Sequence, residues 1–235
     1  MTFLRSLIFL TLQVLLTPLF STLALLTFPF SPLTRYRLIS NYARTMVWLV
    51  QAICGIRYQV RGLENLPDTP CIVLCKHQSA WETLALQVIF PPQAWVLKRE
   101  LLKIPFFGWA LALTSPIAID RSDGKGAMKQ LLKQGKERLA QGFYVVIFPE
   151  GTRVAYGQRG KYKVGGTLLA ASTGVPVVPV AHNAGRLWGR QAFSKHAGVI
   201  TMSIGQPIDP AGMKADEIMA QVENWIEHEI TQLEH

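Results

Sequence analysis

The stretch from Cys71 to Thr83, CIVLCKHQSAWET, decides the fold that we expect for this chain. Its apolar beginning has the length and composition of a buried strand, and a helical pattern starts near Ser79. Ser79 followed three positions later by Glu82 has the spacing of a helix-capping box. A strand that leads through a short turn into a helix is a building unit of α/β folds.

The same stretch places His77 between the strand and the helix. If residues 77–82 were all helical, five steps of about 100° would point His77 and Glu82 away from each other. Contact between them therefore requires His77 in the turn and Glu82 in the first helical turn. An imidazole held by a carboxylate is the usual general base for an alcohol. From these residues alone, a capping box beside an incidental histidine is an equally good interpretation.

Residues 144–153, YVVIFPEGTR, repeat this arrangement, because a buried strand again runs into a turn that carries charged groups. Further alternation of strand and helix patterns predicts one α/β domain over residues 55–235, with a largely parallel, mixed sheet flanked by helices. Open sheets of this kind carry their chemistry beyond the carboxyl ends of the strands. The charged residues that follow predicted strands, and that one crevice can gather, are His77, Lys98, Arg99, Arg121, Glu150 and Arg153.

The N-terminal part of the chain predicts a helical membrane anchor over residues 1–54. Residues 6–34 contain no charged side chain, which exceeds the roughly 20 residues that a spanning helix needs. Pro18 is expected to interrupt this run, and residues 36–54 form a second helix with an apolar stripe. A kinked spanning helix and a pair of helices embedded in one leaflet both fit the pattern. A cleaved signal peptide does not, since no convincing cleavage site follows.

The distribution of charge along the chain indicates which classes of partner to expect. Net charge is +9, and residues 95–165 hold 13 Lys and Arg against 5 Asp and Glu. Such a segment suits an anionic partner, but no nucleic-acid-binding signature is present and the aromatic residues are not interleaved with the basic ones. Cys54, Cys71 and Cys75 lack zinc-ligand spacing and are expected as buried, reduced thiols. We therefore expect no disulfide, metal or cofactor.

Four ordered blocks of the sequence resemble the glycerolipid acyltransferase family, most closely its bacterial members that acylate 1-acylglycerol-3-phosphate. The resemblance covers roughly residues 55–206. One departure is that the usual first motif is His-x4-Asp, whereas the acid here is Glu82. The blocks are His77-x4-Glu82, KREL through IPFFG (98–108), FPEGTR (148–153) and VPVVPV (175–180).

This resemblance implies transfer of a fatty acyl group from acyl-CoA or acyl-carrier protein to 1-acyl-sn-glycerol-3-phosphate, giving phosphatidic acid. It implies an enzyme at the bacterial inner membrane, attached to the lipid bilayer, with its catalytic domain facing the cytoplasm. The acceptor can also be another lysolipid, such as a lyso-ornithine lipid. A different class stays open, namely a membrane-anchored lipid-phosphate binding protein without catalysis.

Within this interpretation His77 is the general base and Glu82 orients it. Arg153 is the best candidate for holding the acceptor phosphate, because a guanidinium grips phosphate through two hydrogen bonds. Lys163 is a weaker candidate. His182, Arg186 and Arg190 are better explained by a solvated loop than by contact with an anionic donor. The other residues assigned to phosphate binding are Lys98, Arg99, Glu150, Gly151 and Thr152.

Overall fold

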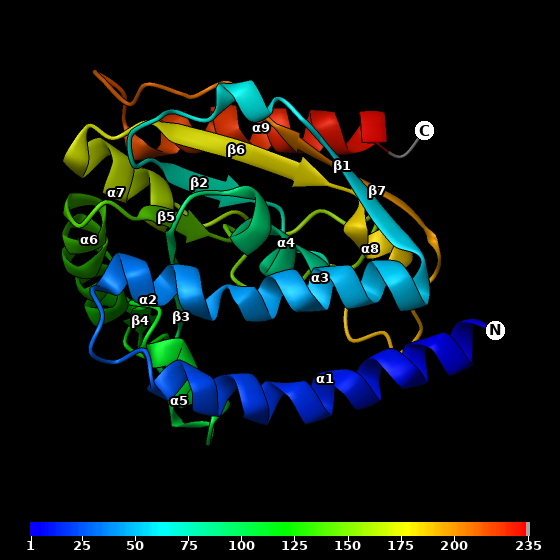
Figure 1. The fold of residues 1–235 in the computed structure, drawn as a ribbon. Helices are drawn as coiled ribbons and strands as arrows, with labels where there is room; N and C mark the ends of the chain where they lie inside the picture. The colour runs from blue at the N-terminus through cyan, green and yellow to red at the C-terminus, as the bar shows by residue number, and fades with distance from the viewer. Residues whose placement is uncertain (234–235) are drawn as a thin grey trace.

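The structure is a computed structural model that describes residues 1–233. Residues 234 and 235, which end the predicted domain, lie outside the described part. A seven-stranded sheet forms the centre of the molecule, with strand order β1-β7-β6-β2-β5-β3-β4 (Figure 1). The strands are β1 (Ile56–Arg61), β2 (Ile72–Cys75), β3 (Gln93–Lys98), β4 (Ile117–Ile119), β5 (Tyr144–Ile147), β6 (Val177–His182) and β7 (Gly198–Ile204).

Neighbouring strands of this sheet pair in parallel except β6 and β7, which are antiparallel. The prediction of an α/β domain with a largely parallel, mixed sheet is therefore confirmed. β2 and β5 lie side by side near the middle of the sheet, with Ile72 opposite Val145. Because their carboxyl ends meet at the same edge, the turn after each strand faces the other.

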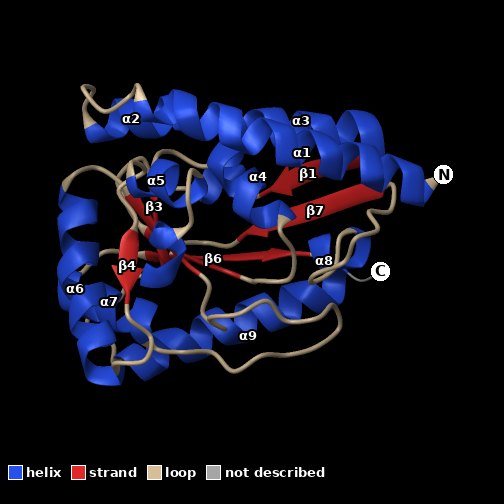
Figure 2. Cartoon of the chain, turned by 90° about the horizontal axis from the view of Figure 1, so that it is seen from below, coloured by secondary structure: helices blue, strands red, loops and turns tan. Residues whose placement is uncertain are grey.

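Helices cover both faces of the sheet (Figure 2). Alternating residues of β2 divide the core between them: Val73 and Cys75 pack with α3 and α4, whereas Ile72 and Leu74 pack with α6, α7 and α9. All three cysteines are buried, as expected. The helices are α1 (Thr2–Leu25), α2 (Pro32–Ile39), α3 (Asn41–Cys54), α4 (Trp81–Ile89), α5 (Phe107–Ala112), α6 (Gly124–Ala140), α7 (Gly165–Thr173), α8 (Ala184–Leu187) and α9 (Ala215–Leu233), with 3₁₀ turns at η1 (Leu63–Asn65) and η2 (Arg99–Lys103).

The N-terminal helices pack against the domain. α1 lies along α3, and Phe9 of α1 is fully buried in the same core cluster as Met46 of α3. By length and composition α1 is able to cross a membrane, and most of its side chains are exposed.

α1 continues through Pro18, where the missing N–H costs one hydrogen bond. Another expectation for this region was wrong in detail. The predicted helix over residues 36–54 is divided at Ser40 into α2 and α3.

The C-terminal helix α9 buries an apolar stripe against the sheet. A periodic pattern of this kind predicts that the acidic residues of the helix lie on its outer face. Glu227 is an exception, because its carboxylate turns inward to the buried ammonium of Lys76, with Oε1 2.6 Å from Nζ. An amphipathic pattern cannot indicate this, since a charged residue at the border of the stripe points to whichever side offers a partner.

Candidate active site

The predicted contact between His77 and Glu82 is present. His77 lies in the turn after β2, Glu82 lies in the first turn of α4, and His77 Nδ1 is 2.8 Å from Glu82 Oε1. The same carboxylate oxygen accepts the backbone N–H groups of Gln78 and Ser79 at 3.1 and 2.9 Å. A carboxylate with these donors holds the proton of the ring on Nδ1, so that Nε2 is left as the basic nitrogen.

Glu82 is completely buried, yet it is held in its charged form. Burial alone raises the pKa of Glu82, but the His182 ring, the hydrogen bond from His77 and the Ser79 N–H together bring it below its ordinary value. The buried carboxylate is therefore an anion that can stabilise an imidazolium at His77.

The predicted capping box is only partly confirmed. Ser79 Oγ accepts the N–H of Trp81 at 3.1 Å, and the helix begins at Trp81 with Ala80 as its N-cap. Glu82 does reach back to the N–H of Ser79, as a capping box requires. Glu82 therefore receives the N–H of Ser79 before the helix and contacts His77 with the same oxygen, so the contacts expected from both interpretations of this stretch are present.

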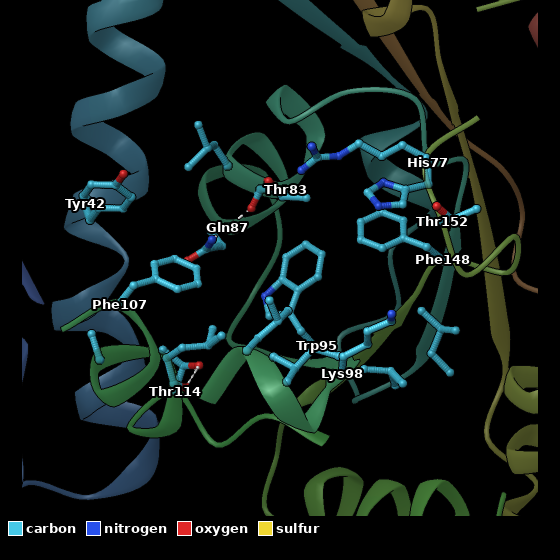
Figure 3. Close-up of a pocket in the computed structure, with 18 of the residues that line it drawn as sticks. Tyr42, His77, Thr83, Gln87, Trp95, Lys98, Phe107, Thr114, Phe148 and Thr152 are labelled. Atoms are coloured by element: carbon cyan, nitrogen blue, oxygen red, sulfur yellow. Dashed lines mark hydrogen bonds between the residues drawn. The ribbon is translucent and has the colours of Figure 1, made fainter. Parts of the chain in front are cut away.

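Phe148 fixes the other side of the imidazole. Its ring stacks on His77 with a centroid distance of 3.8 Å and an angle of 10° between the planes (Figure 3). Trp95 packs on the far side of Phe148, with ring centroids 5.5 Å apart. Sequence reasoning used Phe148 only as part of a motif and missed this contact, which depends on the pairing of β2 with β5.

The turn after β5 lies beside the histidine turn. The N–H of Val154 donates to the backbone oxygen of His77 at 2.8 Å, which ties the two turns together. Gly151 has φ +69°, a conformation that favours glycine, and its backbone oxygen accepts a hydrogen bond from Arg121 at 2.5 Å. The turn can therefore place its side chains around the space in front of His77.

A pocket of about 540 Å³ opens in front of His77. At its polar part the lining includes four of the predicted residues, Lys98, Gly151, Thr152 and Arg153, together with Arg121. Nε of Arg153 is buried and has no hydrogen-bond partner among residues 1–233. A Cβ added to Gly151 would meet Nζ of Lys163 at 2.9 Å, so this lysine stands at the same turn. Cations that gather around an unused guanidinium donor form a site that suits a phosphate.

Two of the predicted phosphate-binding residues lie elsewhere. Glu150 is only 5% exposed and faces inward, with Oε1 3.6 Å from Nζ of Lys76 and 3.4 Å from the backbone nitrogen of His77. Arg99 is exposed at the start of η2 and does not line the pocket. Consecutive residues of a turn point in different directions, which the order of residues in a motif does not reveal.

The rest of the pocket is mainly apolar and extends between α1, α3 and α5 (Figure 3). Several of residues 101–113 line this part of the pocket. Thr17 of α1 and Tyr42 of α3 join their hydroxyl groups at 2.9 Å in the lining. The apolar residues that line this part include Phe20, Leu84, Trp95, Leu101, Phe107 and Leu111.

His182 and Arg190 were both expected in a solvated loop. His182 is instead fully buried at the end of β6, where Nδ1 accepts the N–H of Ala184 and Nε2 donates to the backbone oxygen of Lys76 at 2.9 Å. Burial lowers its pKa. Arg190 is exposed and lines the pocket rim beside Gln191, whereas Arg186 does not line it.

No side chain in the histidine turn is placed as a nucleophile. Ser79 is fully buried and its hydroxyl oxygen accepts the N–H of Trp81 at the start of α4. Burial raises the pKa of Cys71 to about 12 and that of Cys75 well above its ordinary value, so neither thiol ionises readily. Within residues 1–233 no group of His, Cys, Asp and Glu has the arrangement of a metal site.

Several known proteins are similar to this chain in sequence. The sequence profile of the acyltransferase family matches residues 57–183. The chain is 48% identical over 217 residues to the 1-acyl-sn-glycerol-3-phosphate acyltransferase of Pseudomonas aeruginosa, covering 90% of this chain and 84% of that protein. It is 32% identical over 198 residues to the chloroplastic 1-acyl-sn-glycerol-3-phosphate acyltransferase BAT2 of Brassica napus, covering 82% of this chain and 56% of that protein.

A solved structure shares the fold. The crystal structure of the 1-acyl-sn-glycerophosphate acyltransferase PlsC of Thermotoga maritima superposes with a TM-score of 0.82 and 24% sequence identity. The match covers 99% of this chain and 96% of that chain, and therefore includes the N-terminal helices. At this level of identity the similarity concerns the fold.

Proposed function

The chain belongs to the acyltransferase family, and from this premise we propose that it transfers a fatty acyl group to the free hydroxyl of 1-acyl-sn-glycerol-3-phosphate, giving phosphatidic acid. One observation carries the proposal. The His77–Glu82 pair opens onto a pocket that is cationic on one side of the histidine and apolar on the other. A lysophospholipid has this combination of a phosphate, a hydroxyl and an acyl chain.

In the mechanism that this geometry supports, Nε2 of His77 removes the proton of the acceptor hydroxyl as the oxygen attacks the thioester carbonyl. The tetrahedral intermediate then expels the thiolate, which takes the proton back from the imidazolium. Glu82 keeps the Nδ1 proton in place and stabilises the imidazolium while it exists. Direct attack agrees with the absence of a suitable nucleophile in the histidine turn.

The acceptor phosphate lies, in this proposal, between Arg153 and Lys98, with Arg121, Thr152 and the N–H groups of the Gly151 turn close by. Lys163 joins them because of its place over Gly151. The thioester reaches His77 from the apolar part of the pocket, which receives the acyl chain that is transferred. Acyl-CoA and acyl-carrier protein both present such a thioester.

His77→Ala tests the general base. We expect turnover to fall by about 10²–10⁴, the usual weight of a general base, with unchanged folding by circular dichroism. The assay uses purified protein with acyl-CoA and acyl-carrier protein against lysolipids that include 1-acylglycerol-3-phosphate and a lyso-ornithine lipid. Turnover of His77→Ala near the parent value contradicts the mechanism. Activity of the parent with a different lysolipid alone contradicts the assignment of 1-acylglycerol-3-phosphate as the acceptor.

We propose further that α1 attaches the protein to a bilayer, the inner membrane of a bacterium, with the catalytic domain on the cytoplasmic side. The exposed apolar face of α1 supports attachment, and its packing along α3 favours a helix embedded in one leaflet over one that spans it. The protein should then resist extraction by high salt or alkaline carbonate and require detergent. Release by salt alone contradicts this, and a periplasmic N-terminal tag indicates a spanning helix.

A further inference from the structure

Directly before the catalytic histidine, Lys76 carries an ammonium group that is completely buried. Its Nζ lies 2.6 Å from Oε1 of Glu227 and 3.6 Å from Oε1 of Glu150, and 5.7 Å from the centre of the Tyr162 ring. Tyr162 donates its hydroxyl hydrogen to Glu227 at 2.7 Å. We call these four residues the Lys76 cluster.

The cluster joins segments that lie far apart in the sequence. Lys76 is the first residue after β2, Glu150 belongs to the turn after β5, and Glu227 comes from α9. Tyr162 belongs to the loop that leads to Lys163, and the N–H of Lys163 donates to the backbone oxygen of Pro149 at 3.0 Å. The cluster therefore holds the histidine turn, the Arg153 turn and the Lys163 loop at one point.

The backbone of Lys76 is held as firmly as its side chain. Its N–H donates to Val180 at 2.9 Å, and its carbonyl oxygen accepts the ring N–H of His182 at 2.9 Å. The next residue, His77, donates its N–H to Glu150 at 3.4 Å. Movement of the lysine side chain would thus be transmitted to the backbone that carries the imidazole.

A buried ion pair by itself contributes little to the stability of the folded state. Desolvation of the two charges offsets much of their attraction, and apolar residues of similar volume are often as stable or more so. This desolvation cost is expected where the ion pair holds two segments in a fixed relative position. We propose that Lys76 and Glu227 are positioning residues for acyl transfer, in which the ion pair sets the place of His77 relative to the Arg153 turn.

This inference rests on the proposed function and adds to it a role for the C-terminal helix. Misplacement of reacting groups by about 1 Å can cost on the order of 10² in rate. We therefore expect Glu227→Gln to lower kcat by about 10- to 100-fold. KM for the acceptor should rise less, because Arg153 and Lys98 lie outside the cluster.

The experiment compares the parent with Lys76→Met, Glu227→Gln and the double variant in kcat, acceptor KM and melting temperature. Glu227→Gln leaves the buried Lys76 ammonium with Glu150 as its remaining carboxylate partner, and Lys76→Met leaves the partly exposed Glu227 carboxylate without its cation, so both should lower the melting temperature. The double variant removes both charges of the Lys76–Glu227 pair, and Glu150 can stay neutral there because burial raises its pKa, so the variant should recover most of that loss. Its kcat should stay low, because the contact that positions the turn is still missing.

Glu223→Gln is the matched control. Glu223 lies one helical turn before Glu227 and pairs with Arg159 at 2.7 Å, an ion pair on the surface whose arginine side chain is 61% exposed. This variant should keep both its kcat and its melting temperature close to those of the parent. If kcat falls equally in Glu223→Gln and Glu227→Gln, the effect belongs to α9 in general and the proposal is overturned.

A readout without substrate separates this inference from the proposed function. Hydrogen exchange of residues 76–80 and 149–154, measured in detergent, should become faster in Glu227→Gln and in the double variant and stay unchanged in Glu223→Gln. Unchanged exchange in the double variant overturns the positioning role. So does a kcat that recovers together with the melting temperature, since the pair is then only structural.

Discussion

The two turns in front of the pocket each contain a buried glutamate, and the two carboxylates differ in charge. Glu82 in the histidine turn has a pKa below its ordinary value, whereas burial raises the pKa of Glu150 in the neighbouring turn to about 7. Both are almost without exposure, so burial does not distinguish them. The groups that surround the two carboxylates distinguish them.

Glu82 Oε1 receives one hydrogen bond from the His77 ring and two from backbone N–H groups. Glu150 receives one long hydrogen bond from His77 N–H, whereas the Oε2 atoms of both glutamates have no hydrogen-bond partner within residues 1–233. Lys76 is nearer to Glu227 than to Glu150. The nearby His182 ring and the hydrogen bonds to the charged form therefore decide that Glu82 is the carboxylate that stays ionised. The first turn holds a carboxylate anion next to an imidazole, as the proposed proton transfer requires, and the second can tolerate a neutral acid.

The largest expected effect is in the first turn. Glu82→Gln should lower turnover by about 10⁴, because an amide cannot stabilise an imidazolium and can favour the wrong tautomer of His77. Glu82→Asp should also be impaired, since the shorter side chain loses reach to the ring and to the two N–H groups. Steady-state kinetics with folding checked by circular dichroism measures both. A fully active Gln variant would reduce Glu82 to a helix cap.

An intermediate effect is expected for Arg153, on the pocket side of the second turn. Arg153→Lys keeps the charge but loses the planar pair of donors, so KM for the phosphorylated acceptor should rise by about tenfold or more. KM for the acyl donor should change little. Equal increases in both constants would indicate that Arg153 is structural or faces the donor, and that the two turns do not divide catalysis and phosphate binding between them.

The smallest effect on turnover is expected for Glu150→Gln, less than about tenfold near pH 7, where the parent carboxyl is partly neutral. Its effect should be clearer in stability. A carboxyl whose pKa is raised on folding stabilises the folded state at low pH and loses this contribution as pH rises to about 7.

The variant should therefore gain stability relative to the parent between pH 5 and pH 8, by at most about 3 kcal/mol. Chemical unfolding at both pH values measures this difference. A difference of the opposite sign would mean that Glu150 is ionised in the parent, as Glu82 is, and the contrast between the two turns would fail.

The sequence was sufficient for features that depend on near neighbours along the chain. The spacing of His77 and Glu82 left only one arrangement in which they meet, because helix geometry fixes the directions of side chains five residues apart. Alternating apolar patterns located the strands, and their order with the helices indicated a parallel sheet. The division at Ser40 of the helix predicted over residues 36–54 shows the limit of such reasoning.

Other features were decided only by the tertiary structure, because they join residues that strand pairing and helix packing bring together. Lys76 and Glu227 are 151 residues apart, and nothing near either of them indicates a buried partner. The same holds for the stacking of His77 on Phe148 and for the inward direction of Glu150. Covalent geometry relates a residue to its neighbours, whereas the charge and direction of a buried group depend on which distant atoms are available to pair with it.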